Sequence, residues 1–274
     1  MTATLDMPLT PAGPGRWTTL AGPEWRNPGG GLWGGYAIGL AIRVLEAEPG
    51  AVGEALSLTL TFAASLPSGE VDIRTRRLRQ GGSVGVWEVE LLAAGSEQVS
   101  VHAIVTLTRR PNTPAFAFAP MPEAPPPHAL PAPPHPVGGQ HVASSGFERR
   151  SLDSFPPPAT GNSRTLAWVR ARGRSMDKAL LGMITDNSPP RAMYALGPNL
   201  MTTTLTLTVY LHATTEELAA IGEAFILIEC EGRVGGGGAS DERSNYWSPD
   251  GKLLATSEQL AWYRPMPAGA PVST

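Results

Sequence analysis

An aspartate at the edge of an apolar segment is the first residue whose setting suggests chemistry. Asp186 follows a segment in which Met176, Leu180 and Met183 recur at the spacing that stacks side chains on one face of a helix. A carboxylate near a helix C-terminus is disfavoured by the helix dipole, by up to about 1 kcal/mol. Two interpretations stay open: Asp186 opens the turn before Pro189, or it has a catalytic role.

The other candidate nucleophiles and metal ligands have structural explanations. Cys230, the only cysteine, alternates with Glu229 and Glu231 on a predicted strand, so we interpret it as a core thiol with no basic neighbour to lower its pKa. Ser83 satisfies the G-x-S-x-G pattern, but period-two segments flank it on both sides, which indicates a hairpin turn and not a nucleophile elbow. The five histidines lack ligand spacing, so we predict no metal site and no cofactor.

Composition excludes several classes of protein. The 274 residues carry 21 basic and 24 acidic side chains with no block of like charge, which argues against nucleic acid as a partner. No run reaches the 18 or so apolar residues that span a bilayer, and the start of the chain does not resemble a signal peptide. We therefore expect a soluble, cytoplasmic protein with no membrane partner, built as two domains or one large one.

The elements that must position Asp186 fall into two similar sets. The first set is a Gly-rich helix start within residues 27–46 and four predicted strands, at residues 56–65, 70–79, 84–94 and 98–108. The second set contains the helix before Asp186, in the stretch 176–194. Strands are predicted before it at residues 147–152 and 164–172, and after it at residues 201–212, 219–234, 239–247 and 253–263.

Between the two sets lies a proline-rich stretch. Eleven of the 27 residues from 111 to 137 are proline, which can neither pair as a strand nor continue a helix. We predict an N-terminal repeat at residues 1–110, a Pro-rich linker at residues 111–141 and a C-terminal repeat at residues 142–274.

The two sets also repeat each other in letters. Residues 56–63 (LSLTLTFA) resemble residues 205–212 (LTLTVYLH), and the closing segments 108–111 and 262–265 both end in Arg-Pro. The offsets of 149 to 154 residues drift little, so a tandem duplication of a helix-plus-four-strand unit is the economical account. The predicted fold class is α+β, with each unit wrapping a curved antiparallel sheet round a central helix.

Three segments of the second half resemble the TesB-like acyl-CoA thioesterases, a double-hotdog family. Residues 183–186 (MITD) resemble the helix segment that carries the family's catalytic Asp. Residues 204–212 resemble the strand that begins with its Thr, and residues 250–259 resemble the Asp-Gly hairpin and strand that lead to its Gln. The likeness covers about residues 24–110 and 145–265.

The resemblance implies an acyl-CoA substrate, a place in fatty acid metabolism and a catalytic set of Asp186, Thr204 and Gln259. These residues would hold a water, and the carboxylate would help to deprotonate it as it attacks the thioester carbonyl. The offsets of the duplication place Ala55 opposite Thr204 and Val105 opposite Gln259. Only the second half would then keep the chemistry.

Two further features are candidate substrate contacts, each with a structural alternative. Gly34 and Gly35 start a helix whose free N–H groups could bind an oxyanion, or they allow close packing where only glycine fits. Arg76, in an arginine-rich strand, could meet coenzyme A phosphates, or it belongs to a charged outer strand face. The Gly-rich residues 235–240 depart from the family pattern and leave the acyl preference open.

Two alternative functions remain at this point. One is an acyl-thioester binding protein without turnover. The other is a hotdog-fold acyl-CoA hydratase or dehydratase, which would require a histidine paired with the aspartate near the helix. The sequence leaves open whether the chain forms a homodimer or a higher homo-oligomer.

Overall fold

The computed structural model describes residues 5–27, 29–131, 146–152 and 159–267. Its helices are α1 (Gly34–Ala47), α3 (Lys178–Ile184), α4 (Arg191–Leu196) and α5 (Thr215–Ile221), with short 3-10 turns η1 (Pro23–Trp25) and η2 (Pro127–Ala129). The strands before the linker are β1 (Thr10–Gly13), β2 (Arg16–Ala21), β3 (Glu54–Phe62), β4 (Gly69–Gln80), β5 (Val84–Ala93) and β6 (Val99–Thr108). Those after it are β7 (Phe147–Ser151), β8 (Thr165–Ala171), β9 (Leu200–Leu211), β10 (Ile226–Glu231), β11 (Gly235–Gly236), β12 (Ala239–Trp247) and β13 (Leu253–Pro265).

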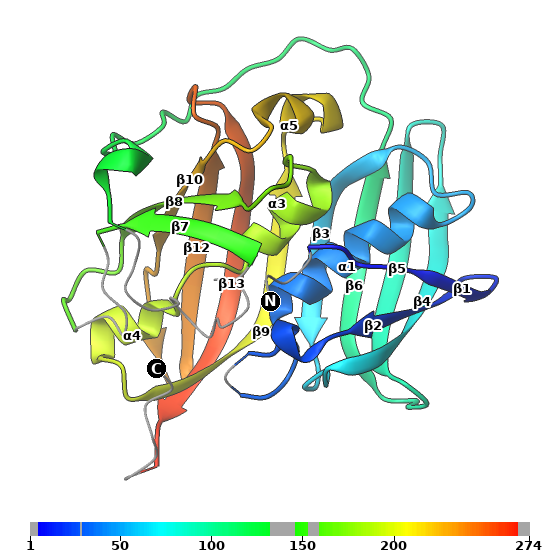
Figure 1. Ribbon diagram of the computed structural model, residues 1–274, viewed down its shortest axis with the longest axis horizontal. Coiled ribbons are helices and arrows are strands. Elements are labelled where there is room, and N and C mark those ends of the chain that lie inside the picture. Colours follow the sequence, from blue (N-terminus) through cyan, green and yellow to red (C-terminus); the bar gives the residue numbers. More distant parts are fainter. Residues whose placement is uncertain (1–4, 28, 132–145, 153–158, 268–274) are drawn as a thin grey trace.

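All described strands belong to one antiparallel sheet, whose two halves have the same strand order (Figure 1). From one edge to the centre the order is β1, β2, β4, β5, β6, β3, and from the other edge it is β7, β8, β10, β12, β13, β9. The halves join where β3 pairs with β9, with Leu58 opposite Val209. The duplication read from the sequence therefore appears as one continuous sheet with an approximate two-fold relation at its centre.

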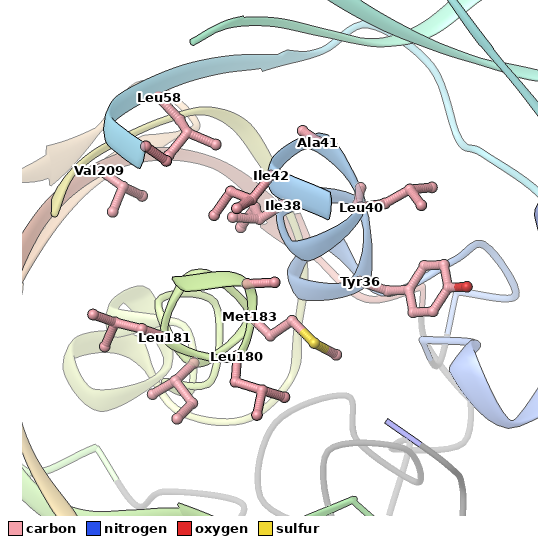
Figure 2. Close-up of a cluster of buried hydrophobic side chains, with 14 of the residues drawn as sticks. Tyr36, Ile38, Leu40, Ala41, Ile42, Leu58, Leu180, Leu181, Met183 and Val209 are labelled. Carbon is pink, nitrogen blue, oxygen red and sulfur yellow. The ribbon is translucent and has the colours of Figure 1, made fainter. Parts of the chain in front are cut away.

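Helices α1 and α3 lie side by side on one face of this sheet and form the centre of the core. Figure 2 shows Ile38 and Ile42 on the side of α1 that faces α3 and the strand residues Leu58 and Val209. Two glycines allow the helices to come close. A Cβ on Gly39 would lie 2.6 Å from Met183 Cγ, and one on Gly182 would lie 2.7 Å from Ile42 Cδ1. Small residues at the crossing are thus required by the packing.

Most predicted elements are present, and three stretches differ from the prediction. The helix predicted before Asp186 is α3, which ends at Ile184, and a second helix that was not predicted, α4, starts at Arg191, directly after Pro189 and Pro190. The predicted strand 219–234 was wrong in its first part. Thr214 and Glu217 form a capping box that starts α5, and the strand β10 begins only at Ile226. The start of the chain, where no strand was predicted, contains the hairpin β1–β2.

The described part of the proline-rich stretch, residues 111–131, contains no strand and runs across the outer face of the second half-sheet. The indole Nε1 of Trp168 donates to the carbonyl of Pro125 at 2.8 Å, and Leu130 packs with Trp168, Leu227 and Trp247. The remainder of the predicted linker, residues 132–141, lies outside the described residues. Within the described chain, no helix has the length and apolar character needed to cross a membrane.

Candidate active site

Asp186 lies at the N-terminus of the other central helix, α1. A Cβ built on Gly34 would be only 2.7 Å from Asp186 Oδ2, and the backbone N–H of Gly35 hydrogen-bonds to the same carboxylate. The free N–H groups and the dipole at a helix N-terminus favour negative charge. The sequence placed Asp186 against the dipole of its own helix, and the packing of the two halves supplies a helix end of the opposite sign.

The backbone around Asp186 is fixed by side chains from three other elements. Three consecutive carbonyl groups after α3 each accept a hydrogen bond, although the last carbonyls of a helix have no partner within it. The donors are Tyr246 Oη to the Thr185 carbonyl at 3.1 Å, Trp33 Nε1 to that of Asp186 at 3.1 Å, and Arg149 Nη1 to that of Asn187 at 3.3 Å. Sequence reasoning missed these donors, because nothing in their local pattern points to a partner far along the chain.

The charge state of Asp186 suits a general base near neutral pH. Burial and, after it, the negative charge of Glu242 raise the pKa of its carboxyl to about 7. The Gly35 N–H and the nearby Trp33 indole act in the opposite direction. Asp186 as a whole residue is half-buried. A base of this pKa can take a proton from water at physiological pH.

Thr204 and Gln259 are brought together on the sheet. Gln259 Nε2 donates to Thr204 Oγ1 at 2.8 Å, across the β9–β13 pair. The ladder is irregular here, because Leu260 pairs with Thr206 whereas the next residue, Ala261, pairs with Thr204. The additional residue between Thr204 and Thr206 forms a β-bulge on β9, which turns the Thr204 side chain to the face that carries the helices. In an unbroken strand with period-two alternation Thr204 would point to the other face.

The first half has the same bulge without the same chemistry. Ala55 pairs with Leu107 across a matching register shift, and Leu58 pairs with Val105, as Leu207 pairs with Gln259. The ladder therefore puts Ala55 and Val105 at the positions that correspond to Thr204 and Gln259, in agreement with the sequence offsets. Both residues are buried and apolar.

A buried acid, Glu242, is related both to Asp186 and to the Thr204–Gln259 pair. Among the hydrogen bonds of the described residues, none joins Asp186 directly to Thr204 or Gln259. Glu242 stands directly opposite Gln259 on β12, and its charge acts on Asp186. Sequence reasoning did not select this glutamate, because it is one of three charged residues in succession on its strand.

Arg76 lies away from these residues. Its side chain is 68% exposed and forms an ion pair with Glu88 at 2.7 Å on the face of the sheet that is turned away from the helices. Nearby Arg74 pairs with Glu97 at 2.8 Å in the same way. This placement favours the interpretation of a charged outer strand face over a coenzyme A contact.

Other candidate groups are occupied elsewhere. His102 pairs with Glu88 at 2.9 Å and His212 with Thr256 at 3.2 Å, both on the outer face, while His135 and His141 lie outside the described residues. In the part of the chain that the structure describes, no group of acids, histidines and cysteine could hold a metal ion. Cys230 is buried, and burial raises the pKa of its thiol to about 12.

Comparison with known proteins identifies the family. Residues 22–108 match the acyl-CoA thioesterase N-terminal domain, and residues 121–263 match the acyl-CoA thioesterase C-terminal domain. The chain therefore belongs to the acyl-CoA thioesterase family and is a thioester hydrolase. No curated protein matches the chain significantly.

Solved structures show the hotdog fold. A hotdog-fold protein of unknown function from Alicyclobacillus acidocaldarius is 25% identical, with a TM-score of 0.86 over 97% of both chains. The tesB protein of Mycobacterium avium subspecies paratuberculosis is 18% identical, with a TM-score of 0.76 over 94% of this chain and 96% of its own. The acyl-CoA thioesterase II TesB2 of Mycobacterium marinum is also 18% identical, with a TM-score of 0.73 over 96% of this chain and 98% of its own.

Proposed function

We propose that this protein hydrolyses acyl-CoA thioesters to free acid and coenzyme A, with a water activated by Asp186 and held by Thr204 and Gln259. The water would lie between the Asp186 carboxylate and the hydroxyl–amide pair. Thr and Gln side chains both donate and accept hydrogen bonds, so they can orient a water that gives its proton to the carboxylate.

The asymmetry between matching positions carries this proposal. Both halves have the same ladder and the same bulge, yet only the second half has a hydroxyl and an amide where the first has Ala55 and Val105. A duplicated scaffold that requires only packing has no reason to place polar groups on the core face of one half alone, since a polar group removed from water costs free energy unless it is paired. The polar half is also the one with Glu242, whose charge acts on Asp186.

The reaction needs no covalent nucleophile from the protein. The water oxygen attacks the thioester carbonyl carbon while Asp186 takes one proton, which gives a tetrahedral intermediate. The carbon–sulfur bond then breaks, the thiolate of coenzyme A receives the proton from Asp186, and the carboxylate is restored. This route agrees with the high pKa of the buried Cys230 thiol, which is not a nucleophile in this setting.

Gly34 and Gly35 are proposed as the site that stabilises the oxyanion. They form the first turn of α1, where N–H groups have no partner within the helix. The Gly35 N–H donates to Asp186, so its bond would be shared or exchanged as charge moves from the base to the substrate oxygen. Arg76 is left out of the proposal.

We further propose that the strand order represents a double hotdog. Its repeats would be residues 1–110 and 142–274, joined by the linker 111–141, and the catalytic residues would lie in the second repeat. A role in fatty acid metabolism in the cytoplasm is part of the same proposal, as is association into a homodimer or higher homo-oligomer.

Thiol release from acyl-CoAs of several chain lengths tests the reaction. The wild type is expected to release thiol on at least part of this panel, and Asp186→Asn is expected to lose about 10² to 10⁴-fold in rate. Asp250→Asn is a matched control, because this carboxylate lies in the exposed β12–β13 turn. If the wild type binds acyl-CoA but releases thiol no faster than Asp186→Asn, the protein is an acyl-thioester binding protein.

The roles of Thr204 and Gln259 are tested by separating turnover from binding. Thr204→Ala and Gln259→Ala are expected to lower kcat more than they raise KM, because the pair holds the attacking water and not the substrate. Thr208→Ala is the control. Thr208 lies on the same strand as Thr204 but points to the outer face of the sheet, where its hydroxyl bonds to that of Thr59. Equal losses in kcat and in substrate affinity would contradict the water-holding role.

A further inference from the structure

The buried glutamate Glu242 has a setting that the proposed reaction does not yet use. Its side chain is 7% exposed on the helix-bearing face of β12, directly opposite Gln259. Residues directly opposite in an antiparallel pair have Cβ atoms about 4.5–5.5 Å apart. A carboxylate at that distance can reach the amide that donates to Thr204.

The charge of Glu242 is held by a buried arginine from α4. Arg191 is 1% exposed, and its Nε lies 3.6 Å from Glu242 Oε2. The same guanidinium donates to the Pro189 carbonyl at 2.8 Å and to Thr165 Oγ1 at 2.8 Å, so several bonds fix it in place. Burial raises the pKa of the Glu242 carboxyl, and the charge of the fixed guanidinium beside it acts in the opposite direction and favours the carboxylate.

The duplication again provides the comparison. In the first half the row Trp87, Val105, Leu58 runs across β5, β6 and β3. In the second half the corresponding row is Glu242, Gln259, Leu207. Trp87 thus occupies the position of Glu242, and a buried acid occurs only in the half that has the hydroxyl, the amide and Asp186.

We propose that Glu242 is a positioning residue of the active site. Arg191 holds the Glu242 carboxylate next to Gln259 and beside Asp186, so that this carboxylate orients the Gln259 amide and adjusts the strength of Asp186 as a base. This inference rests on the proposed function of Asp186. The carboxylate attracts the NH₂ end of Gln259, which fixes the amide with Nε2 toward Thr204 and leaves its oxygen free to accept a hydrogen bond from the water.

The effect on the base follows from the groups that face Asp186. The start of α1 contributes the Gly35 N–H and the Trp33 indole, and β12 contributes Glu242. Glu242 itself faces Arg191 from α4 and Cys230 from β10. Glu242 is the acid that opposes ionisation of Asp186, so its removal lowers the pKa of the base and weakens it as a proton acceptor.

The test is the pH dependence of kcat/KM for acyl-CoA hydrolysis. Glu242→Gln is expected to move the acid limb to lower pH by about one unit and to reduce the plateau several-fold, with KM changed by less than about twofold. Glu258→Gln is the matched control, because this exposed glutamate is next to Gln259 and points to the other face. If the kcat/KM profile of Glu242→Gln has its acid limb at the wild-type pH and its plateau at the wild-type value, the inference is overturned.

A second variant covers the case in which the buried Arg191 loses its carboxylate neighbour and the protein unfolds. Glu242→Asp keeps the charge and shortens the side chain, so it is expected to fold, with kcat reduced several-fold and a smaller shift of the limb. Wild-type kcat and an unmoved limb in this variant would also overturn the inference. Asp186→Asn separates the two proposals. If this variant retains full activity, the proposed base is wrong. If it loses activity while Glu242→Asp behaves as the wild type, only the role of Glu242 is refuted.

Discussion

Adding one methyl group at Gly34 should disturb the chemistry and spare the fold. Gly34 does not have a positive φ, so alanine fits the backbone there, and alanine is favoured over glycine in a helix by up to about 1 kcal/mol. The new Cβ would lie 2.7 Å from Asp186 Oδ2 and 3.4 Å from Phe62 Cε1. The carboxylate is the movable partner in this clash, so it moves and the helix stays.

The size of the effect follows from the distance. An ordinary contact to a Cβ begins at 3.4 Å, so the oxygen must retreat by about 0.7 Å and strain its bond from the Gly35 N–H. A misplacement of about 1 Å at a reacting group costs roughly 10²-fold in rate. We therefore expect Gly34→Ala to lower kcat by roughly tenfold, with a melting temperature equal to or above that of the wild type.

Gly39→Ala is the matched control on the same helix. Its Cβ would lie 2.6 Å from Met183 Cγ at the crossing of α1 and α3, where overpacking costs about 1–3 kcal/mol. This variant should melt earlier and retain kcat at temperatures where it is folded. Thiol release and thermal unfolding, measured on both variants, give opposite patterns if Asp186 works from the N-terminus of α1. Wild-type kcat in Gly34→Ala would refute the placement of the base.

Three further predictions follow from the same geometry. The acid limb of the kcat/KM profile should lie near pH 7, the pKa of Asp186. Because folding raises this pKa from 3.8 to about 7, the free energy of unfolding should fall as pH rises from about 4 to 7. Asp186→Asn should flatten this dependence of thermal stability on pH. Trp33→Phe, which removes the donor at 3.1 Å from the Asp186 carbonyl, should lower kcat several-fold with little change in KM, and wild-type kcat would count against this anchor. Arg76→Ala should leave KM for acyl-CoA unchanged, since its partner is Glu88 on the outer face; a several-fold rise in KM would restore the coenzyme A interpretation.

The sequence located most strands because their faces are set by a local pattern. Period-two alternation fixes which side chains turn to the core, and the strands from β3 to β6 and from β12 to β13 lie within a few residues of their predicted ranges. The pattern failed where a competing local signal was overlooked. The capping box of Thr214 and Glu217 starts α5, which extends to Ile221 and so includes the first residues of the predicted strand 219–234.

By itself the sequence singled out Asp186, predicted a tandem repeat, and placed Thr204 and Gln259 in the second half at the offsets where the first half has Ala55 and Val105. Only the tertiary structure decided what surrounds that carboxylate. The bulge beside Thr204 turns its hydroxyl inward, the start of α1 comes from a segment 150 residues away, and Glu242 and Arg191 meet from separate elements. These contacts depend on how two half-sheets join and two helices cross, and long-range packing leaves no periodic trace in the residues that take part.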